Sequence, residues 1–134
     1  MLKNYILLAL ALLLSACASG SGGGPPYTYN QFLIVNNSKE LIREVTISSA
    51  ATGHSFSCGN IAPLGICSNR TGKRRFKEGQ FQIDWVFGNN APRTDQLTLT
   101  VPAYFVSGLA LQVVLEISPQ GEISTRFEQN TRMR

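Results

Sequence analysis

The chain has 134 residues, of which 43% are hydrophobic and 15% charged, and its formal net charge is +4 at pH 7. This composition excludes a disordered chain, which is poor in hydrophobic residues, and a fibrous chain, which has a biased composition. The length is that of one small globular domain.

The first residues have the features of a secretory leader. Lys3 lies near the start of "MLKNYILLALALLLSAC", and an apolar run from Tyr5 to Leu14 follows it. The run is too short to span a bilayer as a permanent helix, which needs about 20 residues. These residues are therefore expected to contribute nothing to the fold of the mature protein.

The end of this leader resembles the lipobox of bacterial lipoproteins. Leu14-Ser15-Ala16-Cys17 is similar to the pattern Leu-(Ala/Ser)-(Gly/Ala)-Cys of that family. The resemblance implies that signal peptidase II cleaves after Ala16, so that residues 1–16 form the signal peptide and the sulfur of Cys17 carries a lipid. An ordinary signal peptide with an incidental cysteine is the alternative. The resemblance covers the leader alone and implies nothing about the folded domain.

The same resemblance implies a location in the bacterial cell envelope. In that family the cysteine receives a diacylglyceryl group and its amino terminus is acylated, for example with palmitate. Two or more acyl chains hold a protein firmly on a membrane. Ala18 and Ser19 follow Cys17 without an Asp, as in lipoproteins sorted to the outer membrane. We expect a lipid anchor in the outer membrane, with the domain facing the periplasm.

Residues 17–30 are expected to form a tether. Gly and Ser make its first part flexible, and Pro25 and Pro26 stiffen its end. A single folded domain is expected over residues 31–134.

From Gln31 onward, hydrophobic and polar residues alternate with the period of a β-strand. Strands are predicted around residues 32–36, 42–49, 54–58, 80–87, 97–101, 109–117 and 122–127. Turn signals such as "SPQG" separate them, and no long segment has helical spacing. Six or seven antiparallel strands in about 100 residues predict an all-β protein, an immunoglobulin-like antiparallel β-sandwich. A small closed β-barrel is the alternative.

Two cysteines remain once Cys17 is assigned to the lipid. Cys58 and Cys67 form an even pair in an exported protein, which predicts a disulfide. A metal site is the alternative, but zinc usually takes four ligands and His54 is the only histidine. No metal and no cofactor are therefore expected.

A basic segment follows the second cysteine in "NRTGKRRFKEG". It contains five cations, Arg70, Lys73, Arg74, Arg75 and Lys77. Gly72 and Gly79 predict a loop, and Phe76 is a candidate apolar anchor among the cations. Anionic lipid, lipopolysaccharide phosphates or an acidic protein face are the expected partners in the envelope, and nucleic acid is not. A merely solvated face is the alternative.

No catalytic constellation is apparent. There is no G-x-S-x-G nucleophile elbow and no phosphate-binding glycine motif. The acidic residues Asp84, Asp95, Glu116 and Glu122 are predicted to point outward or to lie in turns, where carboxylates normally solvate a sheet. Trp85 is in phase with Phe81, so we expect a core residue; the alternative is a platform on which a sugar or base stacks.

The sequence therefore predicts a non-enzymatic outer-membrane lipoprotein whose β-sandwich binds a protein or an anionic envelope component. In class alone, it resembles the small sandwich lipoproteins of secretion machines, such as the type VI secretion lipoprotein. The alternative is an inhibitor or immunity lipoprotein that blocks a toxin or hydrolase. Its target would be acidic, because the chain is basic.

Overall fold

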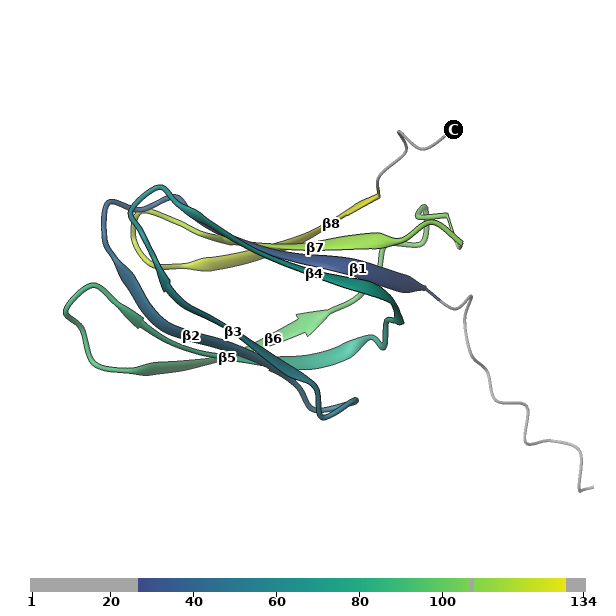
Figure 1. The fold of residues 1–134 in the computed structure, drawn as a ribbon, viewed down its shortest axis with the longest axis horizontal. Helices are drawn as coiled ribbons and strands as arrows, with labels where there is room; N and C mark the ends of the chain where they lie inside the picture. The colour runs from purple at the N-terminus through teal and green to yellow at the C-terminus, as the bar shows by residue number, and fades with distance from the viewer. Residues whose placement is uncertain (1–26, 107, 130–134) are drawn as a thin grey trace, which may run out of the picture.

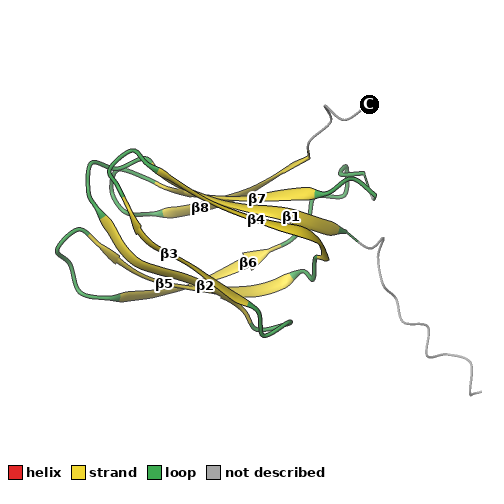
Figure 2. Ribbon diagram, viewed as in Figure 1, coloured by secondary structure: helices red, strands yellow, loops and turns green. Residues whose placement is uncertain are grey.

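Eight strands form two sheets that pack face to face (Figures 1 and 2). The computed structural model describes residues 27–106 and 108–129, so the leader and Cys17 lie outside the described residues. The strands are β1 (Thr28–Asn36), β2 (Ile42–Ser49), β3 (Ser55–Ile61), β4 (Ile66–Arg75), β5 (Gly79–Phe87), β6 (Arg93–Leu99), β7 (Leu111–Ile117) and β8 (Ile123–Gln129). Within these two ranges, no helix is long and apolar enough to cross a membrane.

The strand order is β4-β1-β7-β8 in one sheet, here called sheet A, and β3-β2-β5-β6 in the other, sheet B. Each sheet therefore has two edge strands, which confirms the β-sandwich and shows that the closed barrel was wrong. All pairs are antiparallel except β1 with β7, which run in parallel. The prediction of a wholly antiparallel arrangement was wrong in this one pair.

One strand was missed, because the basic segment predicted as a loop is part of β4. The missed strand "ICSNRTGKRR" has no hydrophobic alternation, and only every second residue of its first half is partly buried. Its backbone pairs with β1 from Val35↔Ile66 to Thr28↔Arg75. Backbone pairing with β1 is therefore enough to form this edge strand, although its side chains bury little surface.

The core lies between the sheets and is built from alternating residues of both. On β5, Phe81, Ile83 and Trp85 are at most 7% exposed, as their period of two predicts. Burying one large apolar side chain stabilises a fold by about 1.5–3 kcal/mol. The other buried members of the cluster are Phe32, Ile34, Ile42, Val45, Ile47, Ile61, Phe76, Leu99, Val101, Leu111, Val113, Leu115 and Ile117.

A buried asparagine joins the two sheets at the end where β1 finishes. Asn36 is 0% exposed. Its amide nitrogen donates to the carbonyl oxygens of Glu40 (2.8 Å) and Ala62 (3.0 Å), which belong to two different connections between the sheets. Its Oδ1 accepts from the backbone N–H of Ser38 (3.0 Å) and from the hydroxyl of the same residue (2.6 Å). One side chain therefore forms hydrogen bonds with both connections that run between the sheets at this end.

The disulfide connects the sheets at one edge of the sandwich. Cys58 lies on β3, an edge strand of sheet B, and Cys67 lies on β4, an edge strand of sheet A. Their Cα atoms are 6.1 Å apart. The two strands do not pair with each other, so the bond braces a crossing between sheets and not a turn within one sheet.

We predict that the double variant Cys58→Ala/Cys67→Ala loses about 2.7 kcal/mol of unfolding free energy, from the chain entropy of a ten-residue loop. Urea unfolding of the exported mature chain measures this loss. The wild type treated with a reductant is the matched control and should lose a similar amount. An unchanged unfolding midpoint in both samples would show that the edge needs no covalent brace.

Candidate functional site

The five cations lie on or just after an edge strand. Arg70, Lys73, Arg74 and Arg75 belong to β4, and Lys77 follows it; all five are exposed. Because β4 pairs only with β1, its other side is open. Lysine and arginine on an exposed edge also prevent the strand from pairing with another chain, so the charges have a structural use in addition to any binding role.

An irregularity of β4 gathers the cations at one end of the sandwich. Tyr29 pairs with Arg74, but Gln31 pairs with Arg70, so two steps along β1 face four steps along β4. The extra residues include Gly72, which is exposed and whose missing Cβ would meet nothing within 4 Å. The bulge therefore gives β4 more cations over this length than a regular ladder would hold.

Phe76 holds the end of the basic segment in the core. Its side chain is 6% exposed and stacks against Phe81, with the ring centroids 6.0 Å apart. Its backbone N–H donates to the carbonyl oxygen of Tyr27 (2.8 Å). The ring is therefore an internal anchor for the cations on either side of it, and it is not free to enter a partner or a membrane.

The charges of the basic segment are not neutralised within the described part of the chain. The ion pairs found there join Arg93 to Asp95, and Arg126 to Glu116 and Glu128. None of them includes a cation of the basic segment. Glu78 is the next acid along the chain, and its carboxylate accepts the backbone N–H of Val101 (2.9 Å). The segment therefore presents a positive field to solvent.

A cleft of about 330 Å³ lies beside the basic segment. It is bounded by β1 and β4 of sheet A and by the β2–β3 turn of sheet B, whose ends face one another on the right of Figure 1. We call it the aromatic cleft, since its lining includes Tyr29, Phe32, Phe56, Phe76 and Phe81. Four of the five predicted cations line it as well: Arg70, Arg74, Arg75 and Lys77. His54 lies in its rim, with an exposed side chain.

No pattern in the sequence indicated this cleft. Its phenylalanines come from four separate segments of the chain, and only Phe76 lies within the basic segment. Each ring taken alone is in phase with an ordinary core position. The signal that pointed to the region was the run of cations, and the structure adds the apolar surface next to them.

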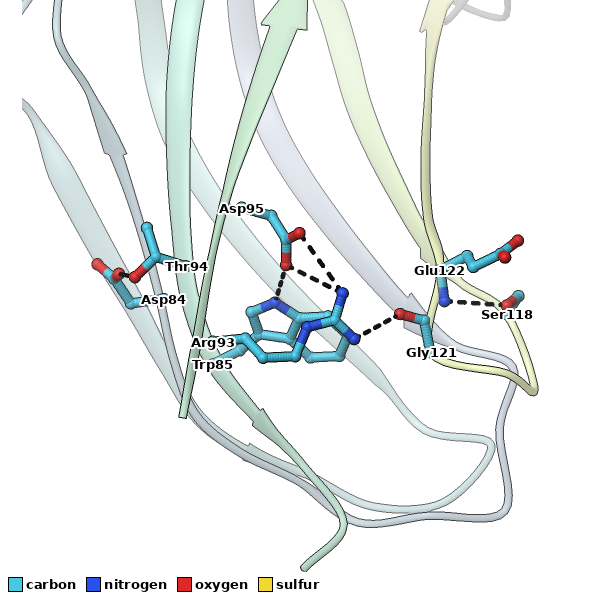
Figure 3. A network of polar contacts seen from close by, with 8 residues as sticks. All are labelled: Asp84, Trp85, Arg93, Thr94, Asp95, Ser118, Gly121 and Glu122. Carbon is cyan, nitrogen blue, oxygen red and sulfur yellow. Dashed lines mark hydrogen bonds and ion pairs between the residues drawn. The ribbon is translucent and has the colours of Figure 1, made fainter. Parts of the chain in front are cut away.

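Trp85 belongs to a polar network at the opposite end (Figure 3). The ring is 1% exposed, so the prediction of a core residue is confirmed and the stacking platform was wrong. Its Nε1 donates to Asp95 (2.6 Å), and the guanidinium of Arg93 lies 4.6 Å from the ring centroid. Arg93 also donates to the carbonyl oxygen of Gly121 (3.1 Å), in the β7–β8 turn of the other sheet. Asp95 thus satisfies a buried donor, whereas the sequence predicted a solvated carboxylate.

Asp84 lies on the solvent side of the same pair of strands. The hydroxyl of Thr94 donates to its Oδ1 (2.6 Å), and the amide of Gln82 donates to both of its oxygens. The Thr94 hydrogen bond, with help from Gln82, lowers the pKa of this carboxyl, against a small effect of burial. The resulting stabilisation is present above the unfolded-state pKa and is lost as pH falls through the folded-state value. Asp84 is therefore ionised at neutral pH and cannot act there as a general acid.

Within residues 27–106 and 108–129, no three His, Cys, Asp or Glu side chains are grouped so that they could hold a metal ion. His54 is exposed in the β2–β3 turn, where its backbone N–H donates to the hydroxyl of Thr52 (3.3 Å). The site is a cleft whose lining combines five aromatic side chains with four exposed cations.

Comparison with known proteins adds little to this description. No protein-family model matches the chain, and no curated protein matches it either. Among solved structures, the chain is similar to the NMR structure of a protein from Eubacterium rectale, with 7% sequence identity and a TM-score of 0.47. That match covers 85% of this chain and 99% of the other. Likeness at this level carries no functional argument, so the site must be interpreted from its own residues.

We predict that the emission of Trp85, the single tryptophan of the chain, is blue-shifted and poorly quenched by acrylamide in the native state. The urea-unfolded protein is the control and should be red-shifted and readily quenched. Trp85→Ala should lower the free energy of unfolding by about 3–5 kcal/mol, as for other large-to-small core changes. Native emission that is quenched as easily as in urea would place the ring in water and contradict the structure.

Proposed function

We propose that the protein is a non-enzymatic lipoprotein of the bacterial outer membrane that binds an anionic envelope component through its basic segment. The observation that carries this proposal is the set of five exposed cations, Arg70, Lys73, Arg74, Arg75 and Lys77, none of which is paired with an acid in the described part of the chain. Head groups of anionic lipids, phosphates of lipopolysaccharide and acidic protein faces all offer complementary charge.

The chain enters the sandwich at the end where the basic segment lies. Thr28, the first residue of β1, pairs with Arg75 at the end of β4. Cys17 precedes Thr28 by eleven residues. Because an extended chain spans at most about 3.6 Å per residue, a lipid on Cys17 would keep this end within about 40 Å of the leaflet. Tethering raises the effective concentration of a surface, so that even weak electrostatic contacts become occupied.

Two large apolar side chains are exposed at this end. Tyr104 is 82% exposed and Val106 is 58% exposed, in the connection between β6 and β7. The hydroxyl of Tyr27 donates to the carbonyl oxygen of Phe105 (3.3 Å), which keeps this connection next to the start of β1. Tyrosine is enriched at membrane–water interfaces, where its ring and hydroxyl meet different surroundings.

The lipid anchor makes a direct prediction. Cys17→Ser should abolish labelling by an alkyne fatty-acid analogue, because the acceptor sulfur is gone. The wild type should be labelled and should remain in the membrane fraction after a high-salt wash. The Cys58→Ala/Cys67→Ala variant is the control for loss of cysteine as such, and it should be labelled like the wild type. Equal labelling of the Cys17→Ser protein would exclude this site of lipidation.

The basic segment makes a second prediction. In the mature chain without its lipid, replacing Lys73, Arg74 and Arg75 by Gln should weaken binding to anionic vesicles by at most about 3 kcal/mol, since each cation near such a surface contributes about 1 kcal/mol. Vesicle co-sedimentation measures the change. The loss should shrink as salt rises, because the screening length falls to about 8 Å at physiological ionic strength.

Lys39→Gln is the matched control, because Lys39 is exposed in the β1–β2 turn at the opposite end of the sandwich. Lys39→Gln should alter binding to anionic vesicles much less than the single change Arg74→Gln does. If the triple variant binds as well as the wild type at low salt, or if neither binds, the segment is a solvated edge and the proposal fails.

A further inference from the structure

The aromatic cleft combines two kinds of surface that ordinary edges of a sandwich do not place together. Toward the disulfide the two edge strands are held close, because Cys58 of β3 is bonded to Cys67 of β4. Two residues farther along each strand, Phe56 and Asn69 already line the cleft. The sheets therefore separate just beyond the covalent brace, and the space between them is open to solvent.

The inner wall of the cleft is apolar and closely packed. The ring of Phe32 lies 5.0 Å from that of Phe56 and 6.0 Å from that of Phe81, measured between centroids. Phe81 in turn stacks with Phe76 at 6.0 Å. Three of these rings are buried and Phe56 is partly buried, so the wall belongs to the core and needs no movement to form. A preformed apolar wall of this kind suits a hydrocarbon or aromatic group of a ligand.

The rim has the opposite character. Arg74, Arg75 and Lys77 line the mouth of the cleft and are exposed. In the part of the chain that the structure describes, they form no ion pair. Arginine presents a planar fork of donors that matches the oxygens of a carboxylate or a phosphate. A ligand that is apolar at one end and anionic at the other would satisfy both surfaces at once.

A buried hydroxyl in the lining is a second, independent indication. Ser49, at the end of β2, lines the cleft and is 7% exposed. Its Oγ has no hydrogen-bond partner among the described residues. Buried polar groups are nearly always paired, so this hydroxyl is a place where a water or another small polar group can complete the bonding.

We propose that the aromatic cleft binds a single-chain amphiphilic anion, with its apolar chain against the phenylalanines and its carboxylate or phosphate at Arg74, Arg75 and Lys77. A volume of about 330 Å³ is at the small end of ligand sites, which suits one alkyl chain better than a complete diacyl lipid. The inference deepens the proposed function and rests on it, since both use the basic segment.

The test uses the mature chain, residues 18–134, exported behind an ordinary cleavable signal peptide so that the disulfide can form. Isothermal titration calorimetry is carried out with decanoate and decyl phosphate below their micelle-forming concentrations. Decyl maltoside and decyltrimethylammonium supply the same chain with a neutral and a cationic head, and inorganic phosphate supplies a head without a chain. Both alkyl anions are expected to bind with one ligand per chain, and the other three probes are not.

Two variants test the rim. Arg74→Gln/Arg75→Gln should weaken decanoate binding by about tenfold or more, since a hydrogen bond to a charged group is lost. Lys73→Gln removes a cation of the same segment that does not line the cleft, and it should have a much smaller effect. Equal losses in the two proteins would mean that the field of the segment, and not the cleft, attracts the anion.

Ser55→Trp tests the cavity itself. Ser55 is exposed on β3 and lines the cleft, and a strand position accepts an aromatic residue. The larger side chain should block decanoate but leave binding to anionic vesicles. Thermal unfolding verifies that the variant is folded; if it is not, Arg74→Gln/Arg75→Gln still decides the question.

The outcomes separate the two proposals. If no alkyl anion binds, or if decyl maltoside or inorganic phosphate binds as well as decanoate, the cleft is not a site for an amphiphilic anion. Salt-dependent binding to anionic vesicles in the same sample would then show that the basic segment still acts as a surface. Failure of both assays would remove both proposals together.

Discussion

The amide of Asn36 fixes how the chain passes from one sheet to the other. It donates hydrogen bonds to two connections and accepts them from one, and it does so at 0% exposure, where an unpaired amide would be strongly unfavourable. One of these connections leads into β4, the basic edge strand. The disulfide then holds this strand against β3. The bulge of β4 and the buried ring of Phe76 then determine how the cations are spaced along the segment.

The two ends of the sandwich consequently differ in kind. The end with Asn36 also has the network in which Trp85, Asp95 and Arg93 link β5 and β6 to the β7–β8 turn of the other sheet (Figure 3). Its buried polar groups are paired, although the apolar side chains of Leu64 and Ile66 are exposed there. The opposite end has the aromatic cleft, the unpaired cations and the exposed side chain of Tyr104. The proposed binding site therefore lies at the end with the unpaired cations.

Strand alternation was sufficient to predict the fold class, because a period of two is dictated by burial on one face. The predicted strand 42–49 has the bounds of β2, and 80–87 lies within β5. β4 could not be predicted in this way, since its residues lie on an open edge and bury little side-chain surface. The parallel partner of β1 could not be predicted either. Alternation shows which side chains face the core, but it does not show which strands pair with each other. The cations were found from sequence, but the cleft beside them depends on rings that only folding brings together.

The parallel pairing of β1 with β7 also has a consequence for the order of folding. Gln31 and Gln112 are hydrogen-bonded across this pair although 81 positions separate them in the chain. During synthesis the first strand therefore appears long before the strand that must lie beside it, and sheet A cannot be completed until almost the whole chain has emerged. Contacts of such long range slow folding, because a large loop must close before they can form. Until β7 has been made, β1 therefore lacks one of its two partners in sheet A.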